Sequence, residues 1–392
     1  MTDQAARLSA EEIQHFEDLA RQFADRSVSS FLQGEFSDGD PSRLGEVIDT
    51  AFTIGIASLP DQSASDNTYG IWGPAAEEMG LLPSVVLLRA VAETCGGVAM
   101  ALHAQGVAGN LLLRAGYQDT SAPRRVALAL QEGFTLPYLD RLLSPVDRDG
   151  QGITTRAVSG PDGHLINGEK SFVYSLPDPQ AYLVMAASGD GWGLYLVPAD
   201  AEGLQRIDPG PRTGLRACEL RHLRFANLRV APSARLGGDR GLQIVFRALS
   251  LSWLGMSAIA VGIASGGLTA ARQYCSERYQ GGTVIENHPA VKALIAGSEA
   301  RMATAGWALS ALAGRDPERL ETVGEAARLK LTAMELCAQA VTDSLQTLGG
   351  YGYMEDYGME KRLRDIAVLR SAAGSSIYLK QLIADIDRKG RA

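Results

Sequence analysis

Hydrophobic residues recur three and four positions apart over most of the first 120 residues, a spacing typical of amphipathic helices. Ser9 precedes the first such segment and Glu12 follows three residues later, as in a capping box. A second helix is predicted from about Pro41 through residue 57, and a third over residues 84–116, broken or kinked at Gly96–Gly97. The first part of the chain is therefore predicted to be helical.

Between about residue 125 and residue 235 the pattern changes to short runs rich in β-branched and aromatic residues. Turn-forming segments such as Pro-Asp-Gly, Asn-Gly-Glu and Gly-Asp-Gly separate these runs. This spacing predicts antiparallel strands in a small barrel or sandwich. Pro232 and Gly237–Gly238 mark the end of this region.

From about residue 240 onward the helical periodicity returns. It predicts helices over residues 241–279, 288–314, 317–350 and 375–390. Helices on both sides of a β-rich region indicate an α+β fold. We expect an N-terminal helical domain over residues 1–122, a middle β-domain over residues 123–236 and a C-terminal helical bundle over residues 237–392.

One apolar run is long enough to raise the question of whether the protein enters a membrane. No charged residue occurs from Ala248 to Ala271, and this length could span a bilayer. The run also holds several serines and four glycines, and Arg247 and Arg272 flank it. A helix that is apolar on all sides also suits the centre of a bundle, so we predict a buried helix and no membrane insertion.

Composition narrows the classes of partner. The chain has 392 residues, and 37 Lys and Arg against 45 Asp and Glu give a net charge of −8. This acidic balance gives no support for binding to nucleic acid. The four cysteines lie far apart and the five histidines lack metal-ligand spacing, so we expect no metal site and a reducing cytoplasm. Of the histidines, only His103 and His288, which lie near glycines, indicate a loop or cavity.

Residues 346–376 carry the most informative motif, QTLGGYGYMEDYGMEKRLRDIAVLRSAAGSS. It resembles the C-terminal signature of the acyl-CoA dehydrogenase family, in which Gln-x-x-Gly-Gly-x-Gly-Tyr precedes an Arg-Asp pair and a Gly-Thr turn. Residues 167–174, 214–232 and 274–282 resemble further segments of that family, in the same order. The resemblance implies the same three-part fold and the cofactor FAD.

The resemblance also implies which residues contact the flavin: Arg278, Gln346, Gly349, Gly350, Gly374, Ser375, Phe172 and Tyr174. An arginine suits the diphosphate through charge-assisted hydrogen bonds, and glycines let backbone amides approach it closely. In this family the arginine and the Gln-x-x-Gly-Gly segment serve the flavin of a neighbouring subunit. A homo- or hetero-oligomer, dimer or tetramer, is therefore implied.

Two departures from the family concern the catalytic base, which removes the α-proton of the acyl group. The family holds a carboxylate either just before the Gly-Thr turn or on the long helix after the β-domain. Here these positions are Ala373 and Ser252. Neither side chain is a competent base, so the catalytic residues stay unassigned.

Other departures lie in the middle domain. Gln131–Glu132 stand in the place of the family's Thr-Glu, and the Gly-Ser-Asp element that follows is missing. Phe172 replaces the usual tryptophan, and Tyr174 replaces a small hydroxyl residue near the flavin N5. We expect Glu132 to end a strand in solvent, with a relocated base as the alternative.

The resemblance favours an FAD-dependent oxidoreductase acting on an acyl thioester of CoA or a carrier protein. Because the base is absent, non-standard chemistry is expected, such as oxygenation by a flavin-dependent monooxygenase or elimination of an anionic β-substituent. Two alternatives remain open: a non-catalytic partner subunit of a heteromeric acyl-CoA dehydrogenase, and a flavin-free binding protein. The sequence does not identify the acyl group.

Overall fold

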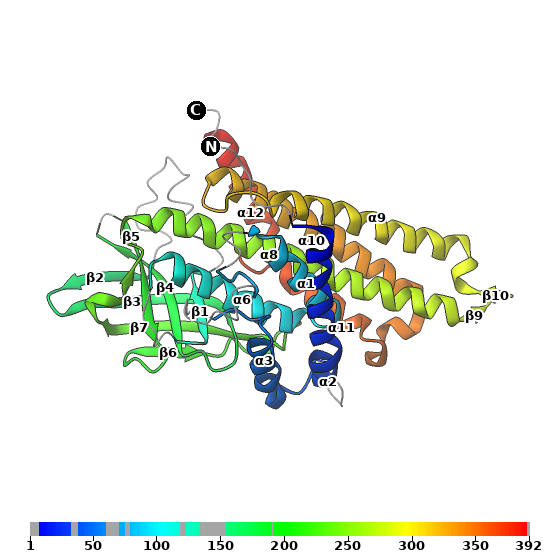
Figure 1. The fold of residues 1–392 in the computed structure, drawn as a ribbon, viewed down its shortest axis with the longest axis horizontal. Helices are drawn as coiled ribbons and strands as arrows, with labels where there is room; N and C mark the ends of the chain where they lie inside the picture. Colours follow the sequence, from blue (N-terminus) through cyan, green and yellow to red (C-terminus); the bar gives the residue numbers. More distant parts are fainter. Residues whose placement is uncertain are drawn as a thin grey trace.

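The computed structural model has a β-sheet at one end and long helices that extend away from it (Figure 1). It describes residues 8–32, 38–59, 70–74, 79–117, 123–133, 136, 154–189 and 191–389. Helices come first along the chain, the strands of the sheet follow, and helices again form the last third. The α+β order predicted from the sequence is confirmed.

The N-terminal helices are α1 (Ala10–Phe23), α2 (Ser29–Leu32), α3 (Leu44–Thr53), α5 (Leu82–Thr94) and α6 (Gly96–Arg114), with a π-helical turn over Ala24–Val28. The capping box is present: the Ser9 amide donates to Glu12 at 2.8 Å and the Glu12 amide donates to the Ser9 hydroxyl at 3.2 Å. The predicted break falls at Cys95, whose backbone is extended. A Cβ on Gly97 would lie 2.9 Å from Ala217, so glycine permits this close packing.

In the described residues the sheet has eight strands: β1 (Val126–Ala129), β2 (Arg156–Gly160), β3 (Gly163–Ser175), β4 (Ala181–Ser188), β5 (Gly191–Pro198), β6 (Leu204–Ile207), β7 (Glu219–Val230) and β8 (Arg235–Leu236). Their order is β6-β7-β3-β2-β4-β5-β8, and β1 pairs with β4. The expectation of antiparallel strands alone was wrong, because β1 and β2 each pair in parallel with β4. Both parallel pairs join strands that are not consecutive along the chain.

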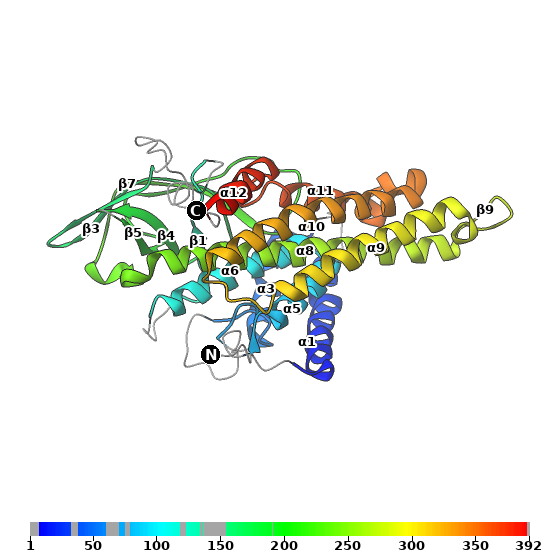
Figure 2. The same ribbon diagram turned by 90° about the horizontal axis from the view of Figure 1, so that it is seen from above.

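The C-terminal helices are α8 (Gly241–Glu277), α9 (Pro289–Leu312), α10 (Leu320–Thr347), α11 (Met359–Leu369) and α12 (Ser376–Lys389). A short hairpin of β9 (Tyr279–Gln280) and β10 (Thr283–Val284) joins α8 to α9. Helix α10 packs against both α8 and α9 (Figure 2). The sequence did not predict α11, because charged residues at five of positions 359–365 obscure its apolar face.

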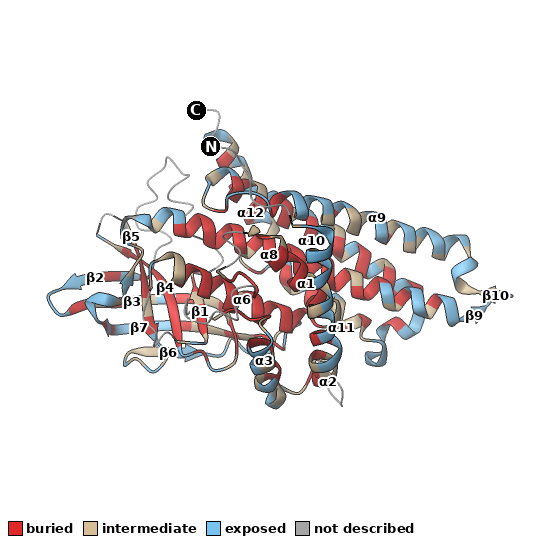
Figure 3. Ribbon diagram, in the orientation of Figure 1, coloured by how far each residue is buried: buried red, intermediate tan, exposed pale blue. Residues whose placement is uncertain are grey.

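Helix α8 contains the apolar run and forms the centre of the molecule. By length and composition it could cross a membrane, but 94% of its most apolar window is buried inside the protein. Buried residues follow α8 and the neighbouring helices α5, α6 and α10 (Figure 3). The prediction of a buried core helix is confirmed.

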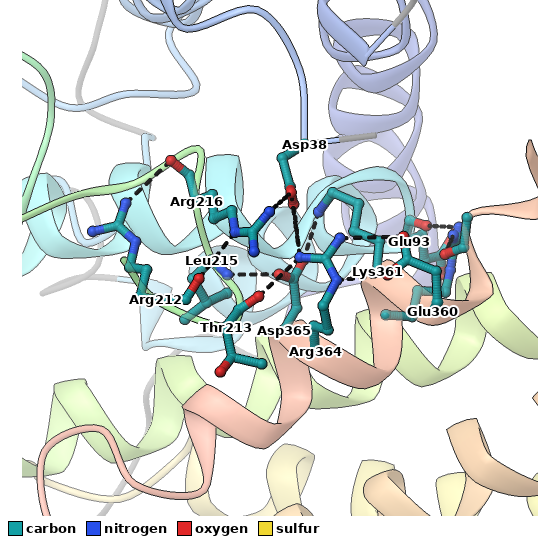
Figure 4. Close-up of polar contacts among 12 residues, drawn as sticks. Asp38, Glu93, Arg212, Thr213, Leu215, Arg216, Glu360, Lys361, Arg364 and Asp365 are labelled. Atoms are coloured by element: carbon teal, nitrogen blue, oxygen red, sulfur yellow. Dashed lines mark hydrogen bonds and ion pairs between the residues drawn. The ribbon is translucent and has the colours of Figure 1, made fainter. Parts of the chain in front are cut away.

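A buried polar cluster connects the N-terminal part, the β-region and α11 (Figure 4). Asp365 on α11 accepts a hydrogen bond from the Leu215 amide at 2.6 Å and pairs with Lys361 at 2.6 Å. Its neighbour Arg364 pairs with Asp38 at 3.2 Å. Since these partners come from segments far apart in sequence, the cluster fixes α11 against the rest of the chain.

Candidate functional site

A largely apolar pocket lies where α6, α8, β1 and β3 meet the turn between α11 and α12. Its free volume is about 80 Å³. The lining residues are Met100, His103, Ala104, Val107, Leu128, Leu130, Gln131, Leu136, Ser171, Phe172, Tyr174, Leu249, Ser252, Met256 and Ala373. No carboxylate is among them, and the described residues hold no cluster suited to a metal ion.

Ser252 and Ala373, the two positions at which the family holds its base, both line this pocket. Ser252 comes from the first third of α8, and Ala373 comes from the turn before α12. Trp253, next to Ser252, donates its indole N–H to the Ala373 carbonyl at 2.8 Å, which joins the two segments directly. Neither a methyl group nor an isolated hydroxyl accepts a proton readily at neutral pH.

Phe172 and Tyr174 also line the pocket, and their contact with a flavin stays a prediction. The pairing of β3 with β7 is shifted between Lys170 and Val173, so Phe172 lies in a bulge with a φ of 54°. A bulge re-aims side chains, and here His222 packs edge-on against the Phe172 ring at 4.8 Å. Burial raises the pKa of the Tyr174 phenol, which keeps it protonated.

Glu132 does not end a strand in solvent, and that expectation was wrong. Its side chain is 2% exposed and pairs with the fully buried Lys170 at 2.7 Å. The Thr154 amide also donates to this carboxylate, as does the Thr155 amide at 3.3 Å. Burial lowers the pKa of Lys170 to about 8, while the Glu132 charge opposes this by favouring the ammonium. Glu132 is thus held in a structural pair and does not line the pocket.

His103 reaches the pocket but is held in its neutral form. The Trp72 indole donates to its Nδ1 at 2.8 Å, so Nε2 carries the proton and bonds the Ser252 carbonyl. Burial lowers the pKa of His103 to about 3. With both ring nitrogens engaged, His103 is not available as a base. His288 lies elsewhere, 2.9 Å from the Gln280 carbonyl, and does not line the pocket.

Four of the residues implied to bind the flavin lie at the far end of the helices. The 26 residues from Ser252, which lines the pocket, to Arg278 cover about 39 Å along the α8 axis. Gln346, Gly349 and Gly350 lie on this distant end, at the end of α10, and are exposed. The structure therefore separates them from Phe172 and Tyr174.

This distant group is open to an outside ligand. The Arg278 guanidinium lies 5.8 Å from the centre of the Tyr351 ring and forms no salt bridge within the described ranges. A Cβ built on Gly349 or Gly350 would meet no atom within 4 Å. An exposed cation beside uncovered backbone suits an anionic group such as a diphosphate.

Gly374 and Ser375 lie beside the pocket, directly after Ala373. Gly374 has a φ of 107°, a conformation that favours glycine. The Ser375 hydroxyl accepts the Tyr378 amide at 3.3 Å, so it caps α12. A capping role does not exclude contact with a ligand, and the fit of these two residues to a flavin stays a prediction.

The chain is similar to known proteins along most of its length. The family model for the acyl-CoA dehydrogenase C-terminal domain matches residues 239–386. The chain is 26% identical over 390 residues to the probable acyl-CoA dehydrogenase YngJ of Bacillus subtilis (strain 168), covering 95% of this chain and 97% of the relative. Residues 239–386 thus belong to the acyl-CoA dehydrogenase C-terminal domain family, and the chain as a whole is similar to acyl-CoA dehydrogenases.

Solved structures of the family share the fold. The butyryl-CoA dehydrogenase from Megasphaera elsdenii superimposes with a TM-score of 0.77 at 21% identity, over 96% of this chain and 98% of that one. The prolyl acyl carrier protein oxidase AnaB gives a TM-score of 0.77 at 20% identity, over the same shares of the two chains. Acyl-CoA dehydrogenase relatives thus include proteins named for CoA substrates and for carrier-protein substrates.

Two residues that shape the pocket were missed by sequence reasoning. Trp253 lies within the apolar run and Lys330 within a predicted helix, and neither position stands out in the sequence. Both are fully buried, and both hold carbonyl groups of the turn at Ala373. A lysine on a helix gives no signal of burial by itself, because its apolar stem and charged head fit either side of a helix surface.

Proposed function

We propose that this acyl-CoA dehydrogenase relative is an FAD-dependent oxidoreductase for an acyl thioester, and that it does not carry out plain α,β-dehydrogenation. One observation carries the proposal: both family base positions, Ser252 and Ala373, face one pocket whose described lining holds no carboxylate. The apolar lining suits an acyl chain. The similarity to acyl-CoA dehydrogenases supports both the thioester and the flavin.

The chemistry follows from the groups in the pocket. A bound flavin would supply the hydride acceptor. The Ala373 methyl cannot take an α-proton, Glu132 is tied to Lys170, and both His103 nitrogens are engaged. The protein therefore binds and orients the acyl group and excludes water from it, but lacks a described group to remove the α-proton.

The residues present fit a flavin shared between two subunits. Phe172 and Tyr174 would border the ring within one chain, while Arg278 and the Gly349–Gly350 backbone would meet the diphosphate held by a neighbour. Ser252, which lines the pocket beside Phe172 and Tyr174, lies near one end of α8, and Arg278 lies at the other end; this separation supports such sharing. We therefore propose an oligomer, and we place it in the cytoplasm, where four free, buried cysteines stay reduced.

Arg278→Ala is expected to weaken flavin retention by about 10- to 150-fold, because it removes a charge-assisted contact worth about 1.5–3 kcal/mol. The measurement is the flavin content of the purified complex after dialysis, read from its visible spectrum. Arg272→Ala is a matched control, since Arg272 lies on the same helix but pairs with Glu299 at 2.8 Å. Equal flavin loss in both variants, or none in Arg278→Ala, contradicts the assignment.

A second candidate function is a partner subunit that lends Arg278 and residues 346–350 to the flavin of an intact homologue. The departures at Gln131–Glu132 and Phe172 favour it, because they alter the half of the site that this chain builds for itself. Purifying the chain alone and recording its visible spectrum separates the candidates. Bound flavin supports the first; flavin that is held only when a homologous partner is present supports the second.

A further inference from the structure

Lys330 on α10 is a buried cation that faces backbone instead of an acid. It is 0% exposed, and no salt bridge to it occurs within the described part of the chain. Its Nζ donates to the Gly374 carbonyl at 2.7 Å and also to the Ala372 carbonyl. Burial lowers the pKa of Lys330 to about 7.

The residue between these two carbonyls is Ala373, part of the pocket wall. Its own carbonyl accepts the Trp253 indole N–H at 2.8 Å. Three successive carbonyls are thus held by two core side chains, one from α8 and one from α10. Ala373 has a φ of 48°, which a residue with a Cβ adopts only when its surroundings impose it.

We propose that Lys330 is the positioning residue of the pocket: by holding the carbonyls on both sides of Ala373, it fixes the direction of the side chain at position 373. Trp253 assists through the carbonyl of Ala373 itself. The identity of the ligand beside this wall, an acyl thioester, rests on the proposed function. The positioning of the turn does not depend on that function. Any group placed at position 373, whether methyl or carboxylate, then depends on Lys330 for its place.

The test uses a thiol at the turn as a probe. All four native cysteines are buried, whereas Ala373 is partly exposed, so Ala373→Cys introduces a reactive thiol at the pocket. Reaction with a small disulfide reagent is followed in the folded, full-length chain. Adding Lys330→Met, which keeps most of the side-chain length but removes the ammonium, is expected to speed this reaction roughly tenfold or more, the factor that loss of one buried charged hydrogen bond allows.

Three further variants of the Ala373→Cys chain distinguish positioning from general loosening. Lys330→Arg keeps the charge and the donors and is expected to restore the slow reaction. Trp253→Phe is expected to speed the reaction, because the hydrogen bond to the Ala373 carbonyl is lost. Cys337→Ala makes a cavity in α10 about two turns from Lys330 and is expected to leave the rate unchanged.

An unchanged rate in Lys330→Met overturns the proposal, and so does an equal acceleration in Cys337→Ala. If Lys330→Met does not fold, the Trp253→Phe and Lys330→Arg variants decide in the same way: slow reaction in Trp253→Phe or fast reaction in Lys330→Arg refutes it. The assay needs neither flavin nor thioester. A failure of the proposed function would instead show in the activity of the Ala373→Glu variant, so the two failures are distinguishable.

Discussion

Replacing Ala373 by glutamate is expected to raise α,β-dehydrogenase activity on a saturated acyl-CoA by about 10²- to 10⁴-fold, the usual contribution of a positioned base. The side chain at 373 already faces the pocket, and the turn that carries it is held by Lys330 and Trp253. An apolar surrounding raises the pKa of a carboxyl group toward neutrality, which suits a general base. The wild-type chain is expected to show negligible turnover.

The measurement is electron transfer to an external dye, with wild type and variant assayed alone and with a homologous partner. Ala373→Gln is the matched control, because it has the size of glutamate without its basicity. Robust turnover by the wild-type chain alone contradicts the proposed function. A gain in Ala373→Glu that occurs only with a partner supports the second candidate function, the partner subunit. An equal gain in Ala373→Gln would show that the carboxylate does not cause the gain.

Much of the fold could be predicted because local patterns agree with the final packing. The capping box at Ser9 is satisfied within four residues, and the break before Gly96 follows from the glycine pair. The apolar run in α8 requires burial wherever it lies. Helix α11 differs: its sequence is rich in charged residues, and only the buried pairing of Lys361 with Asp365 shows that this polar helix belongs to the core.

The site could be predicted only in part. The resemblance located Ser252 and Ala373, but that they face one pocket depends on the packing of α8 against the turn before α12. Glu132 was misplaced because nothing near it in sequence reveals its partner: Lys170 lies on another strand, 38 residues away. Pairings across such distances follow from tertiary structure, which residue spacing along one segment does not encode.

Asp365→Ala is expected to lower the free energy of unfolding by about 3–5 kcal/mol, the cost of breaking a buried ion pair from one side. Asp365 is 1% exposed and is the partner of Lys361, which is also buried. The substitution leaves that ammonium without its charge partner and the Leu215 amide without its acceptor at 2.6 Å. The contact between α11 and the β-region is therefore expected to open first. Urea unfolding, followed by circular dichroism, measures the loss.

Two comparisons assign this loss to the buried pair. Asp385→Ala removes an exposed partner of Arg388 and is expected to cost only about 0–1 kcal/mol. The double variant Lys361→Met/Asp365→Leu replaces both charges by apolar groups of similar size, and it is expected to recover most of the lost stability, since no uncompensated charge stays buried. A double variant no more stable than Asp365→Ala would instead place the effect in the hydrogen bond to Leu215. A loss below about 1 kcal/mol in Asp365→Ala would show that water reaches Lys361 and that this cluster does not fix α11.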